Sequence, residues 1–161
     1  MQIIVASDHG GYNLKEVVKE HLLQEGHQVK DIGTHSQESV DYPDFALKAA
    51  QAVAAGEFSF GIIIGGTGIG VAITANKVAG IRAALCHDTF SAKAAREHND
   101  ANVLTMGERI IGPGLALQIV DTFLATPFAA GRHARRVDKL KDIEENVPKE
   151  ESLAVLFAKD Y

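Results

Sequence analysis

The stretch from Ile62 to Gly70, read as IIIGGTGIG, has the residue types and spacing best suited to chemistry in this chain. Three β-branched residues predict a strand buried on both faces, and the glycines that follow allow a turn whose backbone approaches a ligand closely. The turn amides, the Thr67 hydroxyl and the start of a following helix suit an anion or a developing oxyanion. The pattern is shorter than a dinucleotide fingerprint and lacks the Lys-Ser/Thr of a P-loop. A tight strand-to-helix turn without a ligand is therefore the alternative.

Further polar residues occur where other predicted strands end. Asp8 and His9 follow the predicted strand 2–6, His87-Asp88 follow 81–86, and Glu108-Arg109 lie a little beyond 102–106. Ligands of parallel sheets collect beyond the carboxyl ends of the strands, so this shared location predicts a site. Asp8 has a competing interpretation, because an aspartate in this place also caps the next helix. Arg109 beside Glu108 also has an alternative, a solvated charged surface.

Two more groups could bind or catalyse. His98, next to Asn99 at the end of a predicted helix, titrates near neutrality and can move a proton, or it simply meets the helix dipole. Arg132 and Arg136 are four residues apart, so on a helix they share a face and can grip a phosphate together. On spacing alone, a solvated basic face explains the arginines better.

The elements needed to position these residues alternate along the chain. Apolar runs predict strands at 2–6, 29–32, 60–64, 81–86 and 102–106. Helical patterns predict helices at 13–23, 44–55, 71–77, 91–98, 115–124 and 134–145. Five alternations of strand and helix predict a three-layer α/β/α sandwich around a five-stranded parallel sheet. No linker, internal repeat or low-complexity tract divides the chain.

Composition narrows the class of protein. The chain has 161 residues, 46% of them hydrophobic and 23% charged, as expected of one globular domain. A net charge of −5 gives no general attraction to nucleic acid or to an anionic membrane surface. The single cysteine, Cys86, excludes an intramolecular disulfide and is expected in the core. No apolar run reaches the ~20 residues of a membrane span, and no signal-peptide pattern precedes the first strand, so a cytoplasmic location is expected.

Seven sequence segments, in a fixed order along the chain, resemble those of a known family. They are SDHGG, VDYPDFA, GTGIG followed by ANK, GIRAA, REHNDAN, MGERIIG and GRHARRV. Together they resemble the type B ribose-5-phosphate isomerase family, which includes the subunits of galactose-6-phosphate isomerase, from Ile3 to about Glu144. The resemblance implies a Rossmann-like fold and a homodimer or homotetramer with active sites at the subunit interface. It also implies interconversion of aldose and ketose sugar phosphates without a metal or an organic cofactor.

The same resemblance implies roles for individual residues. Asp8 and His98 would open the sugar ring, and the phosphate would be held by His9, Arg132 and Arg136, with Arg109 supplied by the partner subunit. The enediolate would be steadied by Thr67 and the backbone of Gly66, Gly68, Ile69 and Gly70. Asn99 and Tyr42 would line the sugar.

One position departs from the family pattern. Many members have a cysteine before the Gly66 position that removes the proton beside the carbonyl, and others use a glutamate after the last loop glycine. This chain has Gly65 and Val71 there, so neither usual base exists. Asp8, His98 or Asp41 acting through water is a possible substitute.

Three interpretations therefore stay open. The chain is an altered but active isomerase, most simply of ribose 5-phosphate through a cis-enediolate; it acts with another base on a sugar such as galactose 6-phosphate or allose 6-phosphate; or it binds sugar phosphates with little turnover. The isomerase domain is expected to span residues 1–145. Residues 146–161, which include Leu153, Val155, Leu156 and Phe157, are expected to pack on the body or on a partner subunit.

Overall fold

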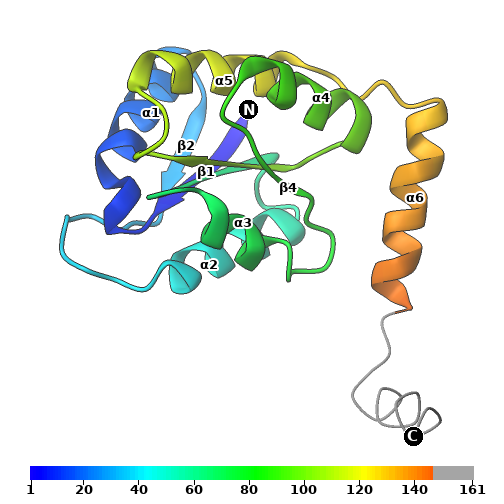
Figure 1. Cartoon of the computed structure of the whole chain (residues 1–161), viewed down its shortest axis with the longest axis horizontal. Coiled ribbons are helices and arrows are strands. Elements are labelled where there is room, and N and C mark those ends of the chain that lie inside the picture. Colours follow the sequence, from blue (N-terminus) through cyan, green and yellow to red (C-terminus); the bar gives the residue numbers. More distant parts are fainter. Residues whose placement is uncertain (147–161) are drawn as a thin grey trace, which may run out of the picture.

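A parallel β-sheet forms the centre of the protein. The computed structural model describes residues 1–146 (Figure 1). Its five strands are β1 (Gln2–Ser7), β2 (Gln28–Asp31), β3 (Phe60–Gly65), β4 (Ala83–Leu85) and β5 (Val103–Gly107), in the order β2-β1-β3-β5-β4. All four strand pairs are parallel, which confirms the predicted sheet.

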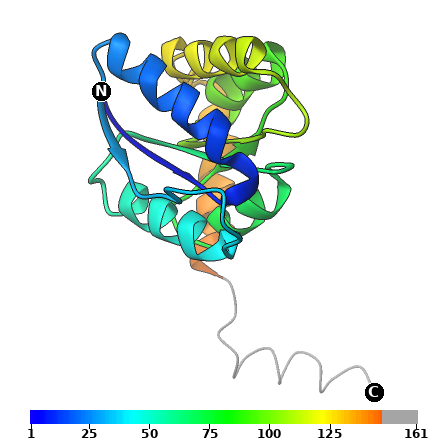
Figure 2. The ribbon, with the colours of Figure 1, turned by 90° about the vertical axis from the view of Figure 1, so that its left-hand side faces the viewer.

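Helices cover both faces of the sheet and so complete the predicted three-layer sandwich. One face is covered by α1 (Tyr12–Gln24), α4 (Thr89–Asn99) and α5 (Pro113–Ala125), and the other by α2 (Tyr42–Ala54) and α3 (Ile69–Ala75) (Figures 1 and 2). A short 3-10 turn, η1 (His9–Gly11), joins β1 to α1. Ile62, Ile63 and Ile64 of β3 are buried because the central strand meets helices on both sides.

The last described helix, α6 (Arg132–Glu145), lies beside the sandwich rather than within its layers (Figure 1). It packs against α4, buries Val137, and its Glu144 Oε2 accepts a hydrogen bond of 2.9 Å from the Gly80 amide. The predicted packing of residues 147–161 lies outside the described residues. No helix within residues 1–146 combines the length and apolar character needed to cross a membrane.

The strand order determines where a ligand can bind. From β1 the chain moves to β2 on one side and then to β3 on the other, so the two connections diverge between β1 and β3. Ligands of open α/β sheets bind at such a switch point, beyond the carboxyl ends of the strands. Because β5 lies next to β3, residues that follow β1, β3 and β5 are neighbours. The edge strand β4 is one strand further away, and it is shorter than predicted because it pairs only with β5.

Candidate active site

A pocket of about 210 Å³ lies at this switch point. It collects nine of the predicted site residues from segments far apart in the sequence. Its walls are formed by Asp8, His9, Gly10, Tyr42, Gly65, Gly66, Thr67, Gly68, Gly70, Val71 and Arg109. Ile69, also predicted for the site, has an exposed side chain that lines a separate hollow with Ile73 and Leu85, so only its backbone belongs to the loop.

The loop after β3 presents backbone N–H groups to the pocket. Gly68 has φ +77°, a conformation that a glycine adopts without strain. Within residues 1–146 the amides of Gly66, Thr67 and Gly68 donate no hydrogen bond, although the loop is anchored by bonds from Glu108 N to Gly65 O (2.9 Å) and from Arg109 N to Gly66 O (3.0 Å). A fixed loop with open donors is the arrangement that stabilises an oxyanion.

Thr67 stabilises the turn after β3 and also lines the pocket. Its Oγ1 accepts a hydrogen bond of 3.3 Å from the Ile69 amide, so the hydroxyl stabilises the turn at the start of α3. The residue is nevertheless exposed and lines the pocket. A hydroxyl oxygen that accepts from the backbone can still donate its own hydrogen to a substrate oxygen.

Asp8 does not act as a helix cap. It occupies the N-cap position of η1, but its side chain makes no capping hydrogen bond. Its Oδ1 is buried and has no partner among the described residues. A Cβ placed on Gly10 would lie 3.3 Å from Asp8 Oδ1 and 3.1 Å from Gly66 N, which is tighter than ordinary contact, so glycine at this position lets the turn pack closely on both residues. The carboxylate and the loop amide therefore lie close together in the wall of one pocket.

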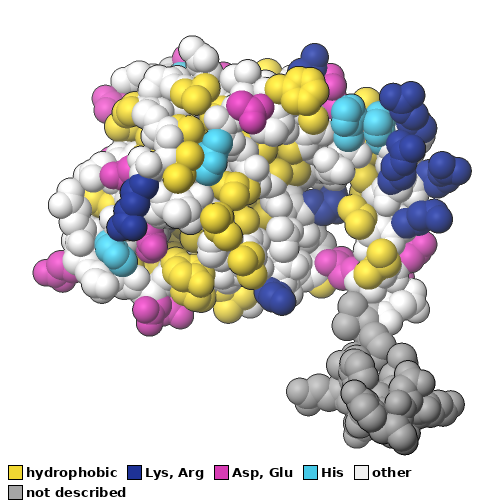
Figure 3. All heavy atoms as spheres, viewed as in Figure 1, with side chains coloured by type: hydrophobic (Ala, Val, Ile, Leu, Met, Phe, Trp, Pro, Cys, Tyr) yellow, Lys and Arg dark blue, Asp and Glu magenta, His cyan; other side chains and the backbone are white. Residues whose placement is uncertain are grey.

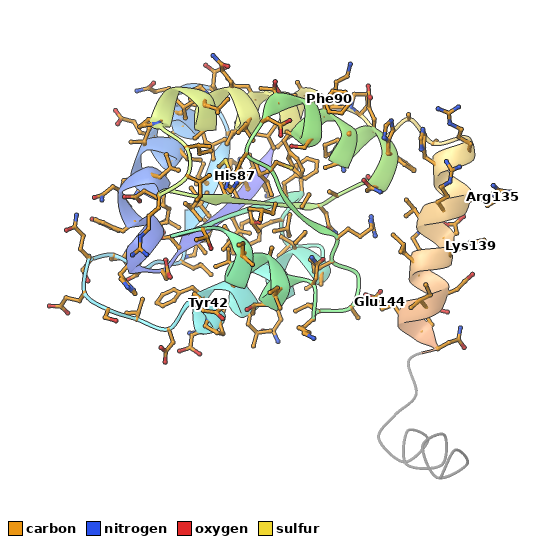
Figure 4. The ribbon with its side chains drawn as sticks, viewed as in Figure 1. Tyr42, His87, Phe90, Arg135, Lys139 and Glu144 are labelled. Carbon is orange, nitrogen blue, oxygen red and sulfur yellow. The ribbon has the colours of Figure 1, made fainter. Side chains whose placement is uncertain are left out.

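His9 contributes a hydrogen-bond donor to the pocket, and the Tyr42 ring closes one side of it. The Val40 amide donates to His9 Nδ1 at 3.2 Å, so the neutral imidazole carries its proton on Nε2 and presents a donor on that side. The Tyr42 ring, at the start of α2 (Figure 4), lies so close to Gly70 that a Cβ there would be 2.7 Å from the tyrosine Cζ. Glycine at this position therefore allows the aromatic ring to close one side of the pocket.

Arg109 supplies the positive charge of the pocket. Its Cζ lies 3.3 Å from the position of a Cβ on Gly66. The preceding Glu108 accepts hydrogen bonds of 2.9 Å from Asn13 Nδ2 and from the Leu14 amide, which fixes the loop after β5 to the start of α1. The resemblance led us to expect this arginine from a partner subunit. Instead it lies in the same chain's pocket as Asp8, because β5 is adjacent to β3.

Four predicted residues form a second, basic group outside the pocket. His98 and Asn99 end α4, Arg132 and Arg136 begin α6, and all four are exposed. Lysine and arginine side chains gather over α6, with histidine side chains beside them (Figure 3). The His98 ring stacks on His133, with ring centroids 4.3 Å apart and an interplanar angle of 15°. Desolvation, followed by the charges of His98, Arg132 and Arg136, lowers the pKa of His133.

This basic group does not line the pocket of its own chain. The predicted meeting of His98 with Asp8 and Thr67 is therefore not made within one copy of the protein. The stacking of His133 on His98 was not predicted. The only signal in the sequence was the position of His133 between two arginines that share a helix face.

The polar pair after β4 has structural roles. His87 Nε2 accepts a hydrogen bond of 3.0 Å from the Gly107 amide, and burial lowers the pKa of His87, which favours the neutral form able to accept (Figure 4). Asp88 caps α4 by accepting from the Ser91 amide at 2.7 Å. Cys86 is buried as predicted, and its burial raises the pKa of the thiol. No three His, Cys, Asp or Glu side chains of residues 1–146 gather as a metal site would require.

Comparison with known proteins places the chain in a family. The family model described as Ribose/Galactose Isomerase matches residues 3–140. Ribose-5-phosphate isomerase B of Escherichia coli is 46% identical over 144 residues, which are 89% of this chain and 97% of that protein. The structure of Clostridium thermocellum ribose-5-phosphate isomerase B is 56% identical, with a TM-score of 0.89 over 90% of this chain and 98% of that one. The Mycoplasma genitalium enzyme, solved with bound ribulose 5-phosphate, is 41% identical, with a TM-score of 0.88 over 91% and 97% of the two chains. The chain therefore belongs to the ribose/galactose isomerase family and is an isomerase enzyme.

Proposed function

We propose that the protein interconverts ribose 5-phosphate and ribulose 5-phosphate through a cis-enediolate. The observation that carries this proposal is the pocket in which the Asp8 carboxylate and the open amides of Gly66 to Gly68 face a common space. An aldose–ketose isomerase needs a group that moves a proton beside donors that hold the developing oxyanion. The ribulose 5-phosphate bound by the Mycoplasma genitalium relative supports this choice of sugar.

We infer further that two copies of the chain complete each site. A pocket of about 210 Å³ is smaller than the ~300–1,000 Å³ usual for a small-molecule site. The exposed basic group of His98, Asn99, Arg132 and Arg136 has donors suited to a phosphate dianion but does not line the pocket of its own chain. Placed over the pocket of a second copy, it would join His9 and Arg109 in holding the phosphate, and Asn99 would meet the sugar.

Ring opening requires proton transfer at the ring oxygen and at the anomeric hydroxyl. In the two-copy site Asp8 of one copy and His98 of the other carry out these transfers. Tyr42 closes the sugar side of the pocket, and Thr67 donates its hydroxyl hydrogen to a substrate oxygen. The location in the cell is expected to be the cytoplasm, where the pool of phosphorylated sugars is found.

A coupled assay with ribose 5-phosphate tests the proposal. We expect conversion to ribulose 5-phosphate, with slower conversion of galactose 6-phosphate and allose 6-phosphate. Faster turnover of either hexose phosphate would show that this sugar phosphate, and not ribose 5-phosphate, is the substrate. The glycine at position 65 favours a second candidate, a binding protein with little turnover, and stabilisation by ribose 5-phosphate in a thermal melt without conversion would establish that alternative.

Mixing two inactive variants tests the shared site. In a dimer made only of the Asp8→Asn chain, or only of the His98→Asn chain, every active site lacks one of the two residues. Random re-association gives half mixed dimers, each with one intact site, so about a quarter of the wild-type activity should return. Recovery that stays at zero, in a mixture shown by mass spectrometry to have exchanged subunits, would mean that both residues act within one chain.

A further inference from the structure

We propose that the Asp8 carboxylate is the base that moves the proton between C1 and C2 of the substrate in this protein. The proposal rests on the isomerase function proposed above and assigns the step for which position 65 has no side chain. Asp8 then has a role beyond ring opening.

The groups that line the pocket leave Asp8 as the proton acceptor. His9 Nδ1 already accepts from the Val40 amide, so its other ring nitrogen is a donor in the neutral form. Arg109 is a cation, and the Thr67 oxygen accepts from the Ile69 amide. Tyr42 presents a phenol whose ring packs on Gly70. Among the lining residues within 1–146, Asp8 alone has a carboxylate.

The other candidates weighed from the sequence do not line the pocket of their own chain. Asp41 is exposed at the start of α2 and is not a lining residue. His98 stacks on His133 and is not a lining residue either, and in the proposed two-copy site it acts at the ring oxygen rather than at C2. Cys86 is buried at the end of β4, where its thiol pKa is raised, and it too lies outside the pocket.

The surroundings of Asp8 leave its carboxylate free to accept a proton. Among the described residues no ion pair involves Asp8, and its buried Oδ1 has no hydrogen-bond partner. A buried acceptor without a partner is costly for folding, so it calls for a functional explanation. Rotation about the Cβ–Cγ bond exchanges the two oxygens, and either one can therefore meet a substrate in the pocket.

The position of Asp8 relative to the loop matches the reacting atoms. In an open-chain aldose the carbon that loses its proton is directly bonded to the carbonyl carbon, so base and oxyanion donor must flank neighbouring atoms. Asp8 Oδ1 and Gly66 N lie 3.3 and 3.1 Å from one point, the Cβ position of Gly10. Both groups also line the same pocket, so a sugar whose carbonyl oxygen is held by the loop amides has its neighbouring carbon close to the carboxylate.

The step balances without a co-reactant. Asp8 takes the proton from C2, the C–H electron pair forms the C1=C2 double bond, and the carbonyl pair moves to O1, which the loop amides stabilise. A proton passes from O2 to O1. The O2 pair then forms the C2 carbonyl while C1 takes the proton back from the Asp8 carboxylic acid. C1 is reduced and C2 is oxidised, and the carboxylate is regenerated.

Ribulose 5-phosphate separates this role from ring opening. Its O5 is phosphorylated, so no furanose ring can close on C2 and the sugar stays open. For Asp8→Asn, which keeps the shape of the side chain, we expect conversion of ribulose 5-phosphate and C1 deuterium exchange in D2O to fall ~10²–10⁴-fold. Asp41→Asn is the matched control and should leave both rates within ~3-fold. His98→Asn, which affects ring opening, should slow net conversion in both directions, and it should lower C1 deuterium exchange of ribulose 5-phosphate much less than Asp8→Asn does.

Each other outcome has a definite meaning. Asp8→Asn that keeps conversion and exchange of ribulose 5-phosphate within ~3-fold, or that loses only ribose 5-phosphate turnover, would overturn the proposal. Asp8→Glu, which keeps a carboxylate, should retain part of the activity and serves if the asparagine variant does not fold. Adding Gly65→Cys to Asp8→Asn should restore exchange if a base is all that is missing. A folded wild-type protein that binds the sugar phosphate but neither converts nor exchanges it would remove the isomerase function itself.

Discussion

Gly65→Cys tests whether the missing side chain limits catalysis. A Cβ at position 65 would lie 3.6 Å from Gly68 N and 3.6 and 3.7 Å from the two Val71 methyl groups, which is ordinary van der Waals contact. The substitution therefore needs no movement of the loop. Removing a glycine from the end of a strand should stabilise the fold by about 0.5–1 kcal/mol. The thiol would point toward the open loop amides, which favour its thiolate.

The expected gain in rate depends on the other base. A positioned general base contributes ~10²–10⁴-fold, or about 2.7–5.5 kcal/mol of barrier. In an Asp8→Asn background the gain should approach this range, and in the wild type it should be smaller because Asp8 already supplies the function. The gain should increase with pH as the thiol ionises, and because the loop amides favour the thiolate, the rise should be complete below the pKa of about 8.5 of a free cysteine.

Stopped-time assays of ribulose 5-phosphate conversion measure this effect, with Gly65→Ala and Gly65→Ser as controls. Both add the Cβ without a thiol, so they should share the stability gain and not the rate gain. If the cysteine variant folds and is no faster than the alanine variant in either background, the empty position is not what limits turnover.

Three further predictions concern phosphate binding and stability. Arg136→Ala should weaken ribose 5-phosphate binding ~10–100-fold in calorimetry without affecting unphosphorylated ribose, because one charge-assisted contact is lost; unchanged affinity would remove Arg136 from the site. Glu108→Ala leaves the Leu14 amide without its 2.9 Å acceptor, so the free energy of unfolding in urea should fall by about 1.5–3 kcal/mol, whereas an equal midpoint would show that solvent replaces the bond. Burial would raise the pKa of Asp31, but hydrogen bonds from Lys15 and Lys19 lower it to about 2. The stability that Asp31 provides should be complete above about pH 4 and disappear toward pH 2, and Asp31→Asn should flatten that part of the urea-unfolding profile.

Short-range patterns predicted the elements well because they report local packing. The run from Ile62 to Ile64 indicated the central buried strand, and the glycines after it indicated the loop. The order of the strands is a long-range property, and no local pattern encodes it. It is the pairing of β5 with β3 that brings Arg109 onto Gly66, and so the expectation of a partner's arginine at this place did not hold.

The role of Asp8 shows a different limit. From sequence, helix capping and catalysis were nearly equal interpretations of an aspartate after a strand. Only the structure shows that the side chain makes no cap and that its Oδ1 has no partner among the described residues.

The basic residues of α4 and α6 show a third limit of prediction from sequence. Arg132 and Arg136 lie on one helix, as their spacing allowed, although that helix begins at Arg132 rather than at 134. The surface they meet belongs, on our proposal, to another copy of the chain, and no sequence pattern specifies a contact between molecules.

The fold does not require glycine at position 65. Gly68 has φ +77°, and a side chain at Gly70 would collide with the Tyr42 ring, so backbone and packing explain both of those glycines. Gly65 has no positive φ, and a Cβ there would make only ordinary van der Waals contact with Gly68 and Val71. Because neither backbone conformation nor packing requires glycine at position 65, we explain the residue there by its effect on catalysis. A glycine is compatible with turnover only if another group in the same pocket handles the proton, and the unpaired carboxylate of Asp8 is the group placed to do so.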